Sequence, residues 1–179
     1  IKSLNDLGLR YNLVNYAEDY DLWVRVLPNM RLSNLQAILL KYRVHKNSIS
    51  VEKKLDQKMN SEKIKKNYLK SLKIDLPQNL ESVFFVIDKS RYDKSYEELK
   101  IICEFFMFLL EKNKGVSVFN HKLLKQYLID LFFEICFYSS KHGYKIWRLW
   151  KTFDFVSKRI ISNKKLLEFY FRCLFHISR

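Results

Sequence analysis

The chain has 179 residues, enough for one domain or for a domain with a short appendage. Apolar residues make up 48% of it, so a sizeable core can form and disorder of the whole chain is excluded. Its three glycines and two prolines are far fewer than usual, which argues against a β-sandwich or barrel and favours long helices. The net charge is +14, mostly after residue 50, and such a surface suits anionic partners such as nucleic acid, lipid headgroups or phosphorylated substrates.

The first 51 residues have a mixed character. Asp19–Leu27 has apolar residues at helical spacing, which predicts a helix that Pro28 ends. Two short strands are expected next, over Arg31–Leu35 and Ile38–His45, because apolar and basic side chains alternate in the second of them.

Beyond residue 51 the sequence is helical almost to its end. Ser95 with Glu98 forms a capping-box pattern, and Gly115 stands where that helix should stop. Ser162 is the expected cap of the last helix, and the apolar run Leu80–Ile87 fits either a helix or a strand. Helices are predicted over Lys53–Lys73, Ser95–Glu111, Val118–Lys141, Tyr144–Ile161 and the residues after Ser162 as far as Ile177.

An acidic run, Glu18-Asp19-Tyr20-Asp21, stands where the first helix should begin. Free N–H groups and the helix dipole stabilise carboxylates there, so Asp19 fits an N-cap and Asp21 fits an i,i+4 pair with Arg25. The alternative is that one of these carboxylates faces a cleft and accepts a proton from a bound substrate.

A second stretch follows about twenty residues later and bears on this choice. The chain reads Ala-Glu-Asp-Tyr-Asp-Leu-Trp-x-Arg, a proline turn, two expected strands, and then Leu-x-Tyr-Arg-x-His-x-x-Ser-x-Ser. In this order and spacing, the two stretches resemble the end of the catalytic domain of family 2 glycosyltransferases, which are inverting enzymes of the GT-A fold. The resemblance covers roughly residues 1–51.

This resemblance implies transfer of a sugar from a nucleotide-sugar donor to an acceptor hydroxyl. The acceptor would be a glycan or a lipid-linked glycan, as in polysaccharide or cell-envelope synthesis. The resemblance also implies roles for individual residues: the general base is Asp19, its support at the acceptor site is Glu18, substrate binding falls to Asp21, Trp23 and Arg43, and the metal or the donor diphosphate is held in part by His45.

The family's donor-binding half is not recognisable in this sequence. That half carries a nucleotide-binding sheet and an Asp-x-Asp metal motif, whereas here Asp-x-Asp occurs only at Asp19–Asp21, within the base motif. We therefore expect the donor site and the main ligands of a divalent metal, Mg²⁺ or Mn²⁺, to lie upstream, and these 179 residues alone to be inactive. The expected fold is mainly α: residues 1–51 are the remnant of an α/β catalytic domain, and residues 52–179 are a helical extension that forms a bundle.

The basic helices after residue 51 match no family motif and leave three interpretations open. They can form a bundle with a solvated surface, a surface that contacts an anionic membrane, or a module that binds nucleic acid. Trp147 falls off the apolar stripe of its helix, beside Arg148 and Lys151, and is the candidate membrane anchor. No RNA- or DNA-binding motif supports the third interpretation. A non-enzymatic basic binding module is therefore the alternative to a glycosyltransferase.

Three cysteines, Cys103, Cys136 and Cys173, each lie in an apolar helical pattern without a Cys-x-x-Cys motif. They predict reduced core thiols in a cytoplasmic protein, with peripheral contact at the inner face of the membrane as a further expectation. The longest stretch without Asp, Glu, Lys or Arg is Leu32–Leu40, far short of the roughly 20 residues that a spanning helix needs.

Overall fold

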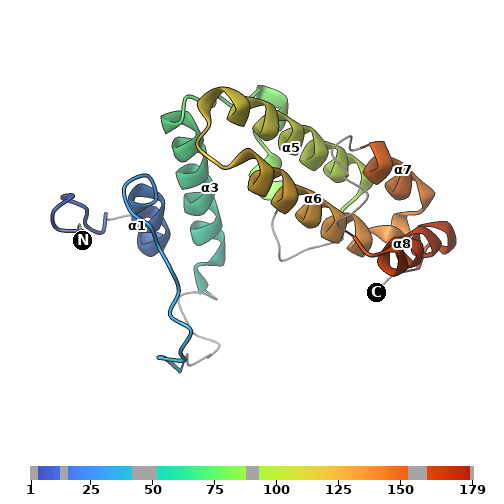
Figure 1. Ribbon diagram of the computed structural model, residues 1–179, viewed down its shortest axis with the longest axis horizontal. Helices are drawn as coiled ribbons and strands as arrows, with labels where there is room; N and C mark the ends of the chain where they lie inside the picture. The colour runs from blue at the N-terminus through green and yellow to red at the C-terminus, as the bar shows by residue number, and fades with distance from the viewer. Residues whose placement is uncertain (1–3, 13–15, 42–51, 88–92, 153–160, 178–179) are drawn as a thin grey trace. The chain divides into compact units, whose positions relative to one another are not determined.

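The computed structural model describes residues 4–12, 16–41, 52–87, 93–152 and 161–177. The chain divides into two compact units, residues 1–71 and residues 72–179. The described residues are mainly helical (Figure 1), as the scarcity of glycine and proline predicts. The domain boundary expected at residue 51 falls within 42–51, outside the described residues. In the part of the chain that is described, no helix combines the length and apolarity needed to cross a membrane.

The described part of the first unit contains the helices α1 (Glu18–Val26) and α3 (Lys54–Ser71), which pack against each other (Figure 1). Helix α1 buries Leu22 and Val26, four residues apart on one face, and it ends before Pro28 as predicted. At the start of α3, the Lys53 ammonium lies 5.9 Å from the centre of the Tyr16 ring. This cation–π contact connects α3 to the residues that lead into α1.

Neither predicted strand is present in the described residues. Arg31–Leu35 forms no strand, and nor do residues 38–41, the described part of Ile38–His45. A strand exists only when its backbone hydrogen-bonds to a neighbouring strand, and the described ranges contain no such partner. The apolar side chains of this segment consequently remain open to water, with Ile38 95% exposed.

The second unit is a helical bundle. Helices α5 and α6 run side by side, and α7 and α8 pack together (Figure 1). In chain order its elements are the 3₁₀ turn η1 (Gln78–Leu80), α4 (Val83–Val86), α5 (Tyr96–Val116), α6 (His121–Tyr138), the 3₁₀ turn η2 (Ser140–His142), α7 (Tyr144–Thr152) and α8 (Asn163–Phe175).

Helix starts in this unit follow the local sequence rules. The predicted capping box is confirmed, because Ser95 Oγ accepts the Glu98 N–H at 3.3 Å while Glu98 Oε2 accepts the Ser95 N–H at 2.7 Å. The predicted cap of α8 is also confirmed, since Ser162 Oγ accepts the Lys165 N–H.

The predicted end of α5 is wrong, because the helix continues through Gly115 to Val116 and ends at Ser117 in the left-handed conformation. The Asn113 side chain explains the extra turn: its amide exchanges two hydrogen bonds with the Phe119 backbone, at 2.9 and 3.0 Å. The Asn113 side chain thus stabilises the turn after α5, which the sequence analysis had expected at Gly115.

Aromatic side chains fill much of the core of the second unit. Phe106 of α5 meets Phe132 of α6 edge to face, with ring centres 6.1 Å apart. Phe133 of α6, Trp150 of α7 and Phe169 of α8 contact one another with ring centres 5.4–5.8 Å apart. Since Phe169 is fully buried between three helices, its replacement by alanine should cost about 3–5 kcal/mol.

The turn between η2 and α7 receives the C-terminal end of α8. Gly143 has φ +93° and ψ −171°, a backbone conformation that is almost restricted to glycine. The His176 ring lies directly over its Cα, with Nδ1 3.2 Å from the Lys141 carbonyl oxygen. The Ser140 hydroxyl also donates to the Ile177 carbonyl at 2.9 Å, so the end of α8 is fastened to this turn.

Candidate functional site

The acidic run lies at the N-terminus of α1, where Glu18 and Asp19 are the first two helical residues. The prediction that Asp19 is the N-cap is wrong, because the N-cap is Ala17, whose carbonyl accepts the Asp21 N–H at 2.9 Å. Burial of Ala17 fixes the chain at this point and starts the helix before Asp19. Asp19 Oδ1 instead accepts the N–H of the next residue, Tyr20, at 2.7 Å.

Both carboxylates at this helix start are exposed. Neither Glu18 nor Asp19 has an ion-pair partner in the part of the chain that the structure describes. Free N–H groups and the helix dipole stabilise negative charge at this position. The carboxylate oxygens can still accept further hydrogen bonds. The pair can therefore meet a ligand from solution.

Asp21, two residues further on, has a different environment. It forms the predicted i,i+4 pair with Arg25, whose Nε and Nη2 both lie 2.9 Å from Asp21 Oδ2. Asp21 Oδ2 also accepts from Asn12 Nδ2 at 3.0 Å, and Arg25 Nη2 donates to the Arg10 carbonyl at 2.7 Å. These contacts fasten residues 10–12 to α1. The predicted role of Asp21 in substrate binding stays a prediction. In the structure its carboxylate binds Arg25 and Asn12.

Trp23 is an exposed aromatic residue of α1, with 45% of its surface open to solvent. It follows Asp19 by four residues, so the two side chains share one face of α1 a single turn apart. An indole ring beside an exposed carboxylate offers a flat apolar surface together with a proton acceptor. The structure thus leaves three of the predicted site residues, Glu18, Asp19 and Trp23, exposed on one helix.

The remaining predicted site residues, Arg43 and His45, lie outside the described residues. Within the described ranges, no group of three or more His, Cys, Asp or Glu side chains is placed to hold a metal ion. The expected metal ligand His45 therefore remains a prediction.

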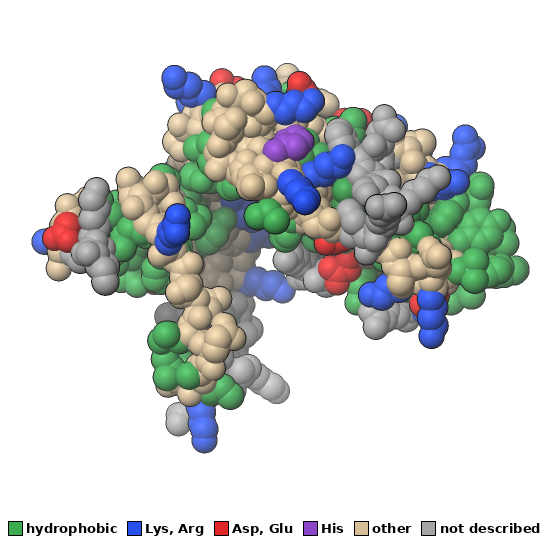
Figure 2. All heavy atoms as spheres, in the orientation of Figure 1, with side chains coloured by type: hydrophobic (Ala, Val, Ile, Leu, Met, Phe, Trp, Pro, Cys, Tyr) green, Lys and Arg blue, Asp and Glu red, His purple; other side chains and the backbone are tan. Residues whose placement is uncertain are grey.

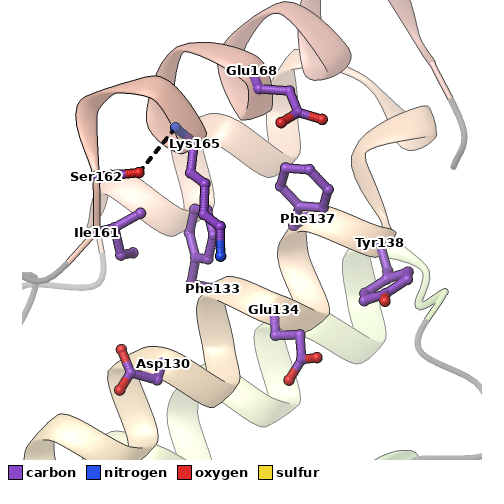
Figure 3. Close-up of a pocket in the computed structure, with 9 residues that line it drawn as sticks. All are labelled: Asp130, Phe133, Glu134, Phe137, Tyr138, Ile161, Ser162, Lys165 and Glu168. Carbon is purple, nitrogen blue, oxygen red and sulfur yellow. Dashed lines mark hydrogen bonds between the residues drawn. The ribbon is translucent and has the colours of Figure 1, made fainter.

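A hollow of about 630 Å³ between α6 and α8 was not foreseen from the sequence (Figure 3). Its aromatic side includes Phe133 and Phe137, and its polar rim includes three carboxylates and one amine. Figure 3 shows the Lys165 side chain extending from α8 toward α6. The hollow is lined by Asp130, Phe133, Glu134, Phe137, Tyr138, Ile161, Ser162, Lys165 and Glu168.

The polar groups around this hollow are largely engaged in the structure. Asp130 accepts from Gln126 Nε2 at 2.9 Å, Glu168 accepts from Arg172 Nε at 3.0 Å, and the Ser162 hydroxyl caps α8. The sequence gives one indication of this polar rim: Asp130 and Glu134, four residues apart, are the two acids in an otherwise apolar stretch of α6.

The cysteines are free thiols, and Cys136 and Cys173 are buried in the core as predicted, whereas Cys103, also expected in the core, is half-buried. Burial raises the pKa of the Cys103 thiol to about 11 and that of Cys173 to about 12, and it raises the pKa of Cys136 well above its usual value. Thiols with such pKa values stay protonated near neutral pH and are poor nucleophiles.

Comparisons with protein families, with curated proteins and with solved structures find no match to this chain. The functional interpretation therefore depends on the residues themselves. Among the described residues of the first unit, Glu18, Asp19 and Trp23 are exposed on α1.

Proposed function

We propose that the chain forms the acceptor side of an inverting glycosyltransferase of the family 2 type. The enzyme transfers a sugar from a nucleotide-sugar donor to a hydroxyl of a glycan or a lipid-linked acceptor. One observation carries the proposal: Glu18 and Asp19 are exposed and without ion-pair partners among the described residues, whereas Asp21 is held by Arg25 and Asn12.

Asp19 acts as the general base. Its carboxylate takes the proton of the acceptor hydroxyl while the hydroxyl oxygen attacks the anomeric carbon of the donor sugar. The new glycosidic bond forms on one face of that carbon as the bond to the donor phosphate breaks on the other, and the electron pair leaves with the nucleoside diphosphate. A positioned base of this kind contributes about 10²–10⁴-fold to the rate.

Glu18 and Trp23 orient the acceptor around this base. The Glu18 carboxylate accepts a hydrogen bond from a second hydroxyl of the acceptor sugar, which has several hydroxyls close together. The Trp23 ring, one turn along the same exposed face of α1 as Asp19, packs against the C–H face of the sugar ring. Holding the acceptor at two points places its reacting hydroxyl within reach of Asp19.

A divalent metal, Mg²⁺ or Mn²⁺, would neutralise the charge that develops on the leaving diphosphate. The described residues contain no group placed to hold it, and the candidate ligand His45 lies outside them. The described part of this chain therefore contributes the base and the acceptor platform, and no step at the diphosphate is assigned to it.

The test uses the intact protein as its gene encodes it. Release of nucleoside diphosphate is measured with a panel of nucleotide-sugar donors, in the presence and absence of Mn²⁺ and of glycan acceptors. Asp19→Asn retains the shape of the side chain but removes the base, so acceptor-dependent release should fall about 10²-fold or more.

The matched control is Asp21→Asn, which lies on the same turn of α1 and makes the same change in charge. It weakens the contacts to Arg25 and Asn12 but leaves the base in place, so its rate should stay within about tenfold of wild type. If a folded intact protein released no nucleoside diphosphate from any donor, or if both variants lost activity equally, the proposal would be wrong.

A further inference from the structure

Helix α8 has two apolar faces. Phe169 and Cys173 are fully buried against the rest of the bundle, as an amphipathic helix requires. On the other side, Leu167, Phe171, Leu174 and Phe175 are 42–63% exposed, and we refer to these four residues as the outer face of α8. The outer face does not pack in the core of the second unit, so another reason is needed for an exposed apolar surface here.

The outer face continues as an aromatic surface toward α7. Phe171 stacks on Phe175 with ring centres 6.2 Å apart, and Tyr170 lies 5.6 Å from Phe171. Tyr144, which is exposed on α7, lies 6.2 Å from Tyr170. Tyrosines at the edge of an apolar patch present a wet hydroxyl end and an apolar ring, as side chains at a membrane–water interface do.

Trp147, the anchor that the sequence suggested, has a different role. Its ring packs against Trp150, Phe169 and Tyr170, with ring centres 5.2–5.4 Å apart, and so fills the contact between α7 and α8. Its side chain is half-buried in this contact.

Cations border this surface, together with the Glu168 carboxylate, which is paired with Arg172. Lys164 precedes Leu167 by three residues and Phe171 by seven, so it lies on the same face of α8. Lys151 lies 5.8 Å from the Trp147 ring centre, at the α7 side. Figure 2 shows hydrophobic side chains gathered over α7 and α8, with Lys and Arg beside them. By contrast, Lys165 is directed toward α6 and the hollow there (Figure 3).

We propose that the outer face of α8 docks on an anionic lipid bilayer, with its leucines and phenylalanines in the headgroup layer and Lys164 and Lys151 at lipid phosphates. Apolar insertion together with attraction to anionic lipid is the usual basis for binding of an interfacial helix. Docking of a second copy is disfavoured, because it would bring together two chains that each carry a net charge of +14. This surface lies in the second unit, so the proposal is independent of the chemistry assigned to α1.

The test is sedimentation of the full chain with vesicles of phosphatidylcholine alone or with about one third phosphatidylserine. The chain should bind the anionic vesicles, and binding should weaken as salt rises above physiological levels, where the Debye length of about 8 Å shortens further. Little binding to the neutral vesicles is expected.

Two matched pairs of variants separate the apolar and the charged contributions. Leu167→Glu should weaken binding at least about tenfold, whereas Leu123→Glu, an equally exposed leucine on α6, should weaken it less than about threefold. Lys164→Gln should weaken binding about fivefold, whereas Lys165→Gln, its neighbour directed toward α6, should change it less than about twofold.

Circular dichroism confirms that each variant is folded, and Phe171→Glu replaces Leu167→Glu if the latter is not. Equal binding to both kinds of vesicle, or no binding by the folded chain, would overturn the proposal. The same conclusion would follow if sedimentation equilibrium showed a dimer that Leu167→Glu dissociates, because the outer face would then belong to a second copy.

Discussion

Replacement of Gly143 by alanine should be among the most damaging small changes in the second unit. Its backbone, at φ +93° and ψ −171°, is strained for any residue with a Cβ, which costs about 1–3 kcal/mol. The new Cβ would also stand 2.4 Å from His176 Cε1, so the ring must move. Movement of the ring gives up the contact of Nδ1 with the Lys141 carbonyl, worth about 0.5–1.5 kcal/mol.

These two contributions together predict a loss of about 1.5–4.5 kcal/mol in the free energy of unfolding of Gly143→Ala. Urea unfolding followed by tryptophan fluorescence measures it, because Trp147 and Trp150 lie in the same unit. Gly115→Ala is the control: Gly115 is helical with no atom close to its Cβ position, so this change should stabilise the chain by about 0.4–1 kcal/mol.

A second variant divides the predicted cost into its parts. In a His176→Ala background, Gly143→Ala meets no ring, so only the backbone cost of about 1–3 kcal/mol should remain. The reasoning would be refuted if Gly143→Ala unfolded within about 0.5 kcal/mol of wild type, or if its cost were unchanged in the His176→Ala background.

Two further predictions concern titrating groups. Burial tends to raise the pKa of Asp93, but hydrogen bonds and charges from Lys141 and His142 outweigh it and lower this pKa. The stability lost in Asp93→Asn should therefore be visible at about pH 6 and should fade as pH falls below about 4, where the wild-type carboxyl also protonates; a deficit that persisted at about pH 2 would contradict this. Cys103, with a pKa of about 11, should react with a thiol reagent at about pH 8 at least about 100-fold more slowly in the folded than in the unfolded chain, and equal rates would contradict its burial.

Features that depend on a few neighbouring residues could be predicted from the sequence. The capping box of Ser95 and Glu98 and the ion pair of Asp21 and Arg25 each span three or four residues, so helix geometry alone determines whether their atoms can meet. The start of α8 at Ser162 follows the same rule.

Features that depend on distant partners could not be predicted. A strand at Arg31–Leu35 requires a neighbouring strand, which the alternation of side chains cannot supply. The position of Trp147 likewise depends on how α8 packs against α7. The extra turn at Gly115 has a nearer cause, the Asn113 side chain reaching the Phe119 backbone, but no simple capping pattern indicates that contact.

The candidate site was predicted in part. The sequence indicated the acidic run at a helix start, but only the structure shows that Asp21 is engaged while Glu18 and Asp19 are exposed. The outer face of α8 had a readable signal, because its apolar residues follow a second helical stripe beside that of Phe169 and Cys173.

The central claim, that Asp19 is the base for glycosyl transfer, is tested most directly by single-turnover transfer in the intact protein. Donor is bound first, acceptor is added, and the rate constant of transfer is measured together with the dissociation constant of the donor. For Asp19→Asn we predict a transfer rate lower by about 10²-fold or more with donor affinity unchanged, because the base acts only in the chemical step. A transfer rate within about threefold of wild type would contradict the assignment of Asp19.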